Sequence, residues 1–202
     1  SNTDGSFTDW IALVNNITCT APAVALNYMN FGRIFTVDRG LPNRGAWEYH
    51  MFAAGIQSTS MPTTGSASYT GATTGFASVY HNGAVTDYSI YSFSGTMGLN
   101  ANFANATLSA TFADIAGNLF RSDNVPGNAS TRTFPGFTLD GTISGATFSG
   151  SATQGDWLRS MNGAFFGPNA PEAGGTFSSN FGNPASAAEA IEIDGSFGAK
   201  KN

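Results

Sequence analysis

The two histidines carry the most direct chemistry in this sequence, and each directly follows a tyrosine, as Tyr49-His50 and Tyr80-His81. Haem iron in proteins can be held by His or by Tyr, so both pairs are candidate haem ligands. His81 is the stronger candidate, because YHNGAV is typical of a strand end that enters a turn. In WEYHMF, strand alternation places His50 on the face opposite Tyr49. The alternative for both histidines is a structural or solvent-exposed role.

A second candidate set lies in the longest break of the sequence pattern, residues 115–136. It contains Phe120, Arg121, Arg132 and Phe134. Aromatic residues together with arginine are typical of hot spots in protein interfaces. Arginine also pairs well with a carboxylate such as a haem propionate. A loop of this length is usually either functional or disordered, so the alternative is a mobile loop whose aromatic and basic residues are incidental.

The sequence offers little for catalysis. No serine sits in a Gly-x-Ser-x-Gly elbow, the histidines lack a matching Asp for a triad, and no glycine-rich segment has a phosphate-loop lysine. Paired carboxylates such as Glu189 and Glu192 are interpreted as solvated charges. Cys19 is the only cysteine, which excludes an internal disulfide framework and a cysteine-based zinc site. We therefore predict no catalytic residue, no metal site and no enzymatic activity.

Composition and charge narrow the possible partners. Charged residues make up 10% of the 202 residues and the net charge is −5, against about 25% charged residues in average domains. The eight basic residues are scattered, so nucleic acid is not an expected partner. No apolar run reaches the roughly 18 residues of a transmembrane helix. The first residues show no export signal, and we expect that any such signal has been removed.

Alternation of apolar and polar residues, with a period of two, dominates from about residue 61. Residues 91–103 and 107–112 alternate on either side of an ANA turn, which predicts a hairpin with one buried face. In all, we expect about eight strands between residues 64 and 199. The other expected strands and hairpins are a hairpin around Gly71-Ala72, a hairpin that turns at Ser144-Gly145, and strands at 161–167, 174–181 and 191–197.

Several inward positions of these strands hold glycine, among them Gly95, Gly141 and Gly195. Interior glycine weakens a flat strand but relieves crowding where a sheet curls. Eight strands also enclose an interior that side chains can nearly fill. We therefore predict an all-β fold built on an eight-stranded antiparallel β-barrel, with a two-sheet sandwich as the alternative. We expect the barrel to be soluble, because its outer face of Ser, Thr and Asn would not suit lipid.

Residues 1–60 follow a different pattern and predict a small N-terminal β-rich appendage, with residues 61–202 as the barrel domain. DWIALVNN predicts a short helix or an irregular packing segment. Two strands are expected in ALNYMNFGRIFTV and AWEYHMFAAG. A linker into the first barrel strand is expected in STSMPTTGS.

Three stretches together carry a family resemblance: MPTTGSASYTG, GTISGATFSG and GAFFGPNAPEAGGTF. Over residues 61–199 the chain resembles the transferrin-binding-protein-like β-barrel family, which includes factor H-binding protein and haemophilin-type haem carriers. In that family an aromatic-Gly-Pro-Asn-Ala turn, followed by Glu and Gly-Gly, joins two late strands. The matching residues here are Phe165 to Ala170, Glu172 and Gly174-Gly175.

This turn motif is expected to be architectural. Pro168 should end the incoming strand, since proline cannot donate to a β-ladder. NAPEA should form one helical turn with Asn169 as its cap. Gly174-Gly175 should supply the unusual backbone angles that let the chain re-enter the sheet.

The resemblance implies a non-enzymatic protein of a Gram-negative bacterium, displayed on the cell surface as an outer-membrane lipoprotein or secreted. It implies capture of haem or of a host protein, and haem or iron acquisition is the leading expectation. The alternative is a surface lipoprotein that binds a host or partner protein through its loops. A weaker alternative is a lipocalin-like carrier of a small apolar ligand, although the many inward Phe, Leu and Met residues count against it.

Overall fold

The computed structural model describes residues 24–38, 46–81, 84–123, 129–154, 157–181 and 189–202. These residues form strands joined by turns and contain no helix long and apolar enough to cross a membrane. The strands are β1 (Met29–Asp38), β2 (Ala46–Gly55), β3 (Ser66–His81), β4 (Ala84–Asn102), β5 (Thr107–Asp123), β6 (Thr131–Thr133), β7 (Phe137–Ser144), β8 (Thr147–Gln154), β9 (Trp157–Phe166), β10 (Glu172–Phe181) and β11 (Glu189–Lys201).

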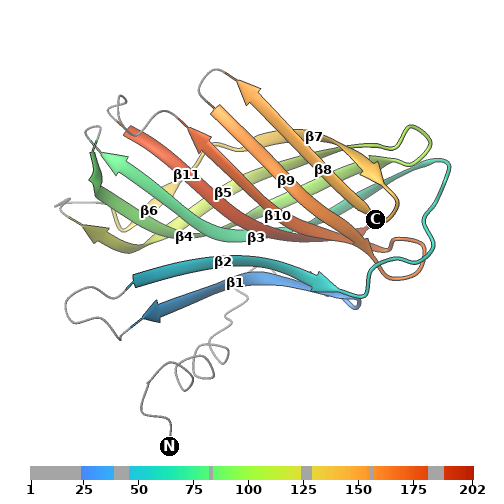
Figure 1. The fold of residues 1–202 in the computed structure, drawn as a ribbon, viewed down its shortest axis with the longest axis horizontal. Helices are drawn as coiled ribbons and strands as arrows, with labels where there is room; N and C mark the ends of the chain where they lie inside the picture. Colours follow the sequence, from blue (N-terminus) through green and yellow to red (C-terminus); the bar gives the residue numbers. More distant parts are fainter. Residues whose placement is uncertain (1–23, 39–45, 82–83, 124–128, 155–156, 182–188) are drawn as a thin grey trace, which may run out of the picture.

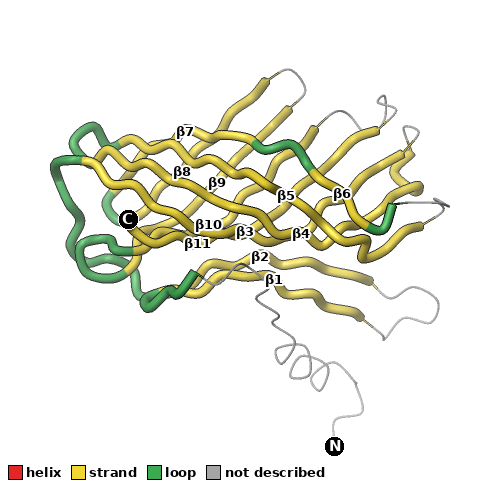
Figure 2. The backbone as a smooth tube through the Cα atoms, turned by 180° about the vertical axis from the view of Figure 1, so that it is seen from behind, coloured by secondary structure: helices red, strands yellow, loops and turns green. Residues whose placement is uncertain are grey.

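Eight of the strands form a closed antiparallel ring. The sheet runs in the order β4-β3-β11-β10-β9-β8-β7-β5, and β4 also pairs with β5, which closes it. Short β6 adds to β5 at residues 116–118, beyond the stretch of β5 that pairs with β7. Figures 1 and 2 show the ring from opposite sides. This closure confirms the predicted eight-stranded barrel over the two-sheet sandwich.

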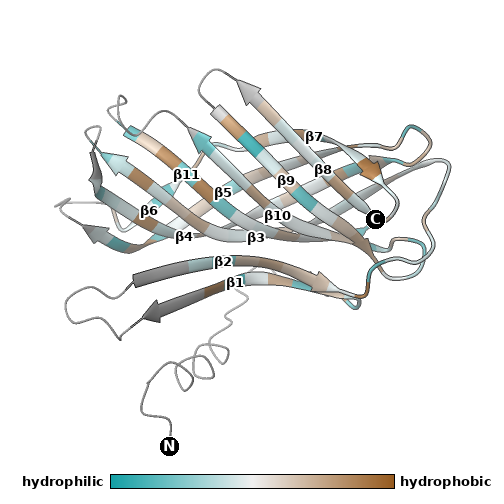
Figure 3. Cartoon of the chain, viewed as in Figure 1, coloured by the Kyte–Doolittle hydropathy of each residue, from teal (hydrophilic) through white to brown (hydrophobic). Residues whose placement is uncertain are grey.

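Aromatic rings fill the centre of the barrel. Phe112 lies 4.3 Å from Phe177, 4.9 Å from Phe137 and 5.4 Å from Phe197, measured between ring centroids. Apolar and polar residues alternate along the strands (Figure 3), which directs one set of side chains inward. The core therefore occupies the space where a lipocalin-like carrier would hold its ligand. Other members of this core are Tyr69, Phe93, Met97, Leu99, Leu139, Phe148, Met161, Phe165 and Ile193.

Turns among the described residues mark one end of the barrel. At one end, which we call the turn end, tight turns at 103–106, 145–146 and 167–171 join neighbouring strands. At the other end, the loop end, β3 stops at His81, β5 at Asp123 and β10 at Phe181. In Figure 1 the loop end lies opposite the C-terminus.

Strands β1 and β2 pair along their whole length and form a separate two-stranded sheet. This sheet lies along the outside of the barrel (Figure 1), where it contacts β3, β10 and β11. Met29 and Phe31 of β1 fit over glycines of the barrel. A Cβ on Gly174 would lie 2.2 Å from Met29 Cε, and a Cβ on Gly198 would lie 2.4 Å from Phe31 Cδ1. These glycines therefore form sockets for the appendage.

The appendage strands lie where the sequence predicts them, at 29–38 and 46–55. The segment DWIALVNN and Cys19 lie outside the described residues. The division into an appendage of residues 1–60 and a barrel of residues 61–202 stays a prediction.

The predicted hairpin around Gly71-Ala72 is wrong, because β3 runs without interruption from Ser66 to His81. Gly71 serves close packing rather than a turn. A Cβ there would lie 2.0 Å from the backbone oxygen of Gly198 on β11. Ala72 faces outward into the small apolar cluster that holds Met29.

The predicted long loop at 115–136 is wrong over much of its length, since β5 continues to Asp123 and β6 follows. The β4–β5 register shifts near Ile90 and again between Ser94 and Thr96. Asp114, opposite the second shift, has a left-handed backbone with φ of 52°. Such bulges shift the alternation of apolar and polar residues by one position. The sequence of a continuous strand then lacks the period of two that would identify it.

The turn motif is architectural, but its local structure differs from the expectation. Residues 167–170 form a turn rather than a helical turn, and the next strand begins at Glu172. The left-handed angles belong to Gly167, Asn169 and Ala170, with φ of 75°, 61° and 56°. The predicted unusual angles at Gly174-Gly175 are wrong, because both glycines lie inside the regular β9–β10 pairing.

Candidate functional site

Two of the predicted site residues, Tyr49 and Phe120, meet on the outer face of the barrel near the loop end. Both lie against Phe76 of β3, at centroid distances of 4.4 Å for Tyr49 and 5.6 Å for Phe120. The Tyr49 and Phe120 rings are themselves 6.5 Å apart. Phe120 is 44% exposed. The three rings form a surface group that joins β2 of the appendage to β3 and β5 of the barrel.

Two further predicted residues, Tyr80 and Arg121, each contact Tyr88 on the same face. Tyr80 lies two alternations beyond Phe76 on β3, so both point outward. Its ring is 6.3 Å from that of Tyr88, and the Arg121 guanidinium lies 5.8 Å from the Tyr88 ring centroid. We refer to Tyr49, Phe76, Tyr80, Tyr88, Phe120 and Arg121 together as the aromatic patch.

Arg33 of β1 holds the base of this patch. Its guanidinium carbon lies 4.8 Å from the Phe76 ring centroid. Its Nη1 donates to the backbone oxygens of Gly75 at 2.7 Å and Phe93 at 3.3 Å. Burial lowers the pKa of Arg33 from its usual value. The carbonyl contacts compensate for this desolvation and tie the appendage to the barrel beneath the patch.

The Tyr80 hydroxyl is already engaged. It donates to Glu192 Oε2 at 3.0 Å. Burial, followed by the hydrogen bond to Glu192 and its charge, raises the pKa of Tyr80 to about 12. The phenol is therefore neutral at physiological pH and acts as a hydrogen-bond donor.

His81 and Arg132 meet through Glu189 at the loop end. Arg132 donates to the Glu189 carboxylate with Nη1 at 2.8 Å and Nη2 at 2.6 Å. His81 Nδ1 lies 3.9 Å from the same carboxylate, and its Nε2 lies 3.1 Å from Ser89 Oγ. The Arg132 hydrogen bond holds the pKa of Glu189 below its usual value. The bridge links β6 to β11. These two strands are not neighbours in the sheet, because β6 pairs with β5, and β4 and β3 lie between β5 and β11.

The remaining predicted residues are Phe134 and His50. Phe134 is 6% exposed and packs edge-on against Tyr91 at 5.7 Å, so it belongs to the core. The Arg132 guanidinium also lies 5.7 Å from the Phe134 ring centroid. His50 is exposed, opposite Ile34 in the β1–β2 pair, on the other face of β2 from Tyr49. The structure thus sorts the predicted residues into the aromatic patch, the Glu189 bridge, one core residue and one separate histidine.

Sequence reasoning missed Phe76, Tyr88 and Glu189 as parts of these groups. Phe76 did carry a usable signal. It occupies an outward position of its strand, flanked at the same face by Thr74 and Ser78. Tyr80 is a second large aromatic at an outward position of the same strand, and apolar residues that gather on an outer face indicate a covered or binding surface.

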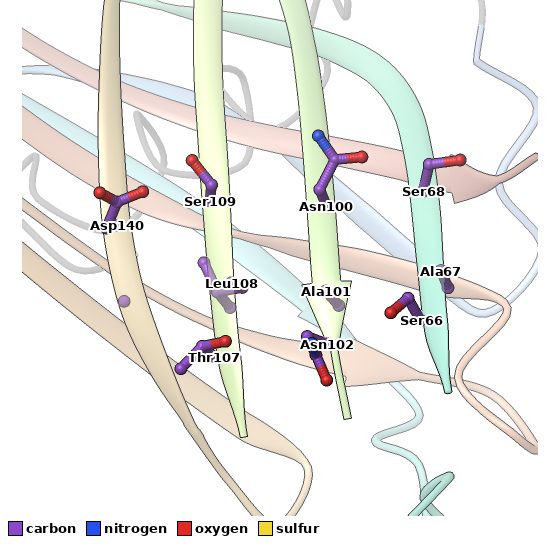
Figure 4. Close-up of a pocket in the computed structure, with 11 residues that line it drawn as sticks. Ser66, Ala67, Ser68, Asn100, Ala101, Asn102, Thr107, Leu108, Ser109 and Asp140 are labelled. Carbon is purple, nitrogen blue, oxygen red and sulfur yellow. The ribbon is translucent and has the colours of Figure 1, made fainter. Parts of the chain in front are cut away.

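Two depressions on the outer surface are lined by described residues. The first lies between β2 and the barrel strands β3, β9, β10 and β11. The second lies near the turn end, where Ser68, Asn100, Ser109 and Asp140 stand in a row on four neighbouring strands (Figure 4). Among the described residues, no three His, Cys, Asp or Glu side chains gather closely enough to hold a metal ion.

Sequence comparison identifies relatives of this chain. Residues 61–201 match the family described as the C-lobe and N-lobe β-barrels of Tf-binding protein B. Transferrin-binding protein B of Haemophilus influenzae strain KW20 is 29% identical over 181 residues, covering 79% of this chain and 26% of the relative. The protein of strain 86-028NP is 26% identical over 171 residues, with the same coverage. The chain thus spans about a quarter of the length of these curated relatives.

Solved structures show the same fold. A double mutant of transferrin-binding protein B from Haemophilus parasuis Hp5 superposes with a TM-score of 0.54 at 23% identity, over 88% of this chain and 33% of that one. A mutant from Actinobacillus pleuropneumoniae H49 gives a TM-score of 0.52 at 16% identity, over 100% of this chain and 89% of that one. Because the family model matches residues 61–201, more than half of the chain, the chain belongs to the transferrin-binding protein B β-barrels, as its three motif stretches together predicted.

Proposed function

We propose that this chain is a binding lobe, without catalytic activity, of a Gram-negative protein that is displayed on the cell surface as a lipoprotein or secreted. Its proposed ligand is a host iron-carrying protein of the transferrin type. Family membership supports the proposal, since the curated relatives are named transferrin-binding protein B.

The aromatic patch is the observation that carries this proposal. Exposed Phe120 lies beside Arg121, and both rest on further rings that are fixed from below. Aromatic and arginine side chains on a rigid support are the residues that dominate binding energy in protein interfaces. The patch also spans appendage and barrel, so one partner would contact both parts.

Surface plasmon resonance with immobilised human, porcine and bovine transferrin, each with and without iron, tests the proposal. We expect wild type to bind at least one of them, and Phe120→Ala or Arg121→Ala to weaken binding by roughly tenfold or more. Leu158→Ala is the matched control, because Leu158 on β9 is 56% exposed and lies outside the patch. Absence of binding at about 10 μM protein, or an equal loss with Leu158→Ala, would contradict the proposal.

Haem capture is a second proposal, supported by the Tyr80–Tyr88–Arg121 part of the patch. Flat rings beside a guanidinium suit a porphyrin and its propionates. It ranks second because Tyr80 already contacts Glu192 and His81 already contacts Ser89 and Glu189. A haemin titration followed by Soret absorption tests it, with His81→Ala, His50→Ala, Tyr80→Phe and Tyr49→Phe variants. A saturable shift that weakens in one variant would support haem capture, and no shift at micromolar protein would refute it.

A further inference from the structure

The depression between the appendage and the barrel is a cleft with the dimensions of a ligand site. Its volume is about 410 Å³, within the range of roughly 300–1,000 Å³ typical of small-molecule sites. Tyr49 and Met51 of β2 form one wall. The opposite wall is the outer face of β3, β11, β10 and β9. The cleft is distinct from the exposed side of the aromatic patch, although Tyr49 and Phe76 border both.

The barrel wall of the cleft is a small grid of polar side chains. Asp194, Ser178 and Ser160 stand side by side on β11, β10 and β9, because they are register partners in turn. Ser160 Oγ and Ser178 Oγ lie 2.9 Å apart and share a hydrogen bond. Thr176 and Asn162 form the next row, again as register partners. The wall therefore presents hydroxyl, amide and carboxylate groups at the spacing of neighbouring strands, about 4.8 Å.

Asp194 is the charged group of this wall. Within the described part of the chain, its carboxylate makes no ion pair or hydrogen bond. Although Asp194 is accessible from solvent, the walls of the cleft partly desolvate it, and Glu192 lies close. Burial first, and the Glu192 charge second, raise the pKa of Asp194. A ligand that donates hydrogen bonds to this carboxylate would offset both effects.

We propose that this cleft binds a neutral saccharide of one or two pyranose rings. Sugar hydroxyls both donate and accept, as do the Ser, Thr and Asn groups of the wall, while Asp194 only accepts. Tyr49, Met51 and Phe76, which also line the cleft, supply an apolar border for the C–H face of a sugar ring.

Other ligand classes fit this cleft less well. An anionic ligand would face Asp194 and the nearby Glu192. A bound Ca²⁺ takes about six to eight oxygen ligands, most of them carboxylates and carbonyls, whereas this wall offers one carboxylate among hydroxyls. A purely apolar ligand would leave the polar wall without partners. The proposal does not rest on the proposed function, because it concerns the cleft alone and its test includes no host protein.

The test is a glycan array probed with the fluorescently labelled chain, followed by calorimetry with the strongest neutral glycan. We expect wild type to bind at least one neutral glycan, and Asp194→Ala and Asn162→Ala each to weaken binding by roughly tenfold. Asp140→Ala is the matched control, since Asp140 is also exposed and outward-facing but lies in the other depression (Figure 4). Melting curves of all variants verify that each one folds.

Three results would overturn the proposal. The first is no neutral glycan above background for folded wild type. The second is binding that Asp194→Ala and Asn162→Ala leave unchanged, or that Asp140→Ala weakens equally. The third is calorimetric binding of spermidine, rather than any glycan, that depends on Asp194, which would identify the cleft as a cation site. None of these results depends on whether the chain binds transferrin, so each proposal can fail alone.

Discussion

The Glu172 carboxylate accepts a hydrogen bond from the backbone nitrogen of Asn27 at 2.6 Å, although the two residues are 145 positions apart. Its other oxygen accepts from the backbone nitrogens of Tyr28 at 2.9 Å and Met29 at 3.1 Å. Glu172 is 1% exposed. The acid of the late turn motif thus anchors the appendage, by satisfying three backbone donors just where β1 begins.

Replacing this acid should therefore loosen the appendage. In Glu172→Gln, an amide NH₂ would face backbone donors and the charge would be lost. Since hydrogen bonds to charged groups contribute about 1.5–3 kcal/mol, we expect the free energy of unfolding to fall by about 2 kcal/mol. Urea unfolding measures the loss, and hydrogen exchange should show faster exchange at residues 27–29. Asp140→Asn, an exposed carboxylate change, should shift stability by less than about 0.5 kcal/mol.

The Arg132–Glu189 bridge should give the loop end a pH-dependent stability. Arg132 lowers the pKa of Glu189, so the bridge stabilises the fold above the ordinary Glu value of 4.5 and is lost as pH falls through the lowered value. Because the pair is partly exposed, its contribution at pH 7 should stay below about 1 kcal/mol.

Thermal melting of wild type and Glu189→Gln at several pH values measures this effect. Wild type should be the more stable protein at pH 7, and the difference should shrink once the pH falls below 4.5. A difference that stays constant down to acidic pH would assign the effect to packing rather than to ionisation.

Truncation of Phe112 and truncation of Phe120 should have different effects: the first should lower stability, and the second should mainly weaken partner binding. Phe112 has no solvent exposure and contacts three other rings, so Phe112→Ala should cost about 3–5 kcal/mol of stability. Phe120→Ala, on the surface, should cost less than about 1 kcal/mol while it weakens partner binding. Urea unfolding of both variants measures the contrast. Similar losses of stability would mean that Phe120 is structural.

A larger side chain at Gly174 or Gly198, the glycines that contact Met29 and Phe31, should weaken docking of the appendage on the barrel. Gly198→Val would place a side chain where the Phe31 ring lies, and such overpacking typically costs about 1–3 kcal/mol. Gly98→Val is the matched control, because a Cβ there meets no atom within 4 Å. Limited proteolysis should cleave the appendage faster in the first variant only. Equal cleavage in both variants would argue against the socket.

Much of the barrel could be predicted because its strands carry local information. The alternation in residues 91–103 specifies a strand and its buried face without any knowledge of neighbours, and β4 confirms it. The errors arise where a long-range contact sets the residue choice. The sequence around Gly71 predicts a turn, but this position holds glycine because the backbone of β11 leaves no room for a side chain. The same applies to β5. The bulges near Asp114 interrupt the alternation of apolar and polar residues, so the sequence pattern alone does not identify this strand.

The candidate site was less predictable than the fold. Residue types identified Tyr49, Phe120 and Arg121 as suited to binding. Their meeting depends on how β2 docks on the barrel, which no local pattern encodes. The same holds for His81 and Arg132, which Glu189 joins from a third strand.

Ring closure has a consequence for the order of folding. Successive strands of the ring pair with near neighbours in sequence, except that β11 pairs with β3, with Lys201 opposite Tyr69. That last seam must close a loop of more than a hundred residues, and such non-local pairing slows folding. During synthesis, β3 therefore stays without this partner until β11 has been made. Until then the chain presents an open edge, the state in which it is most exposed to misassembly or to a chaperone.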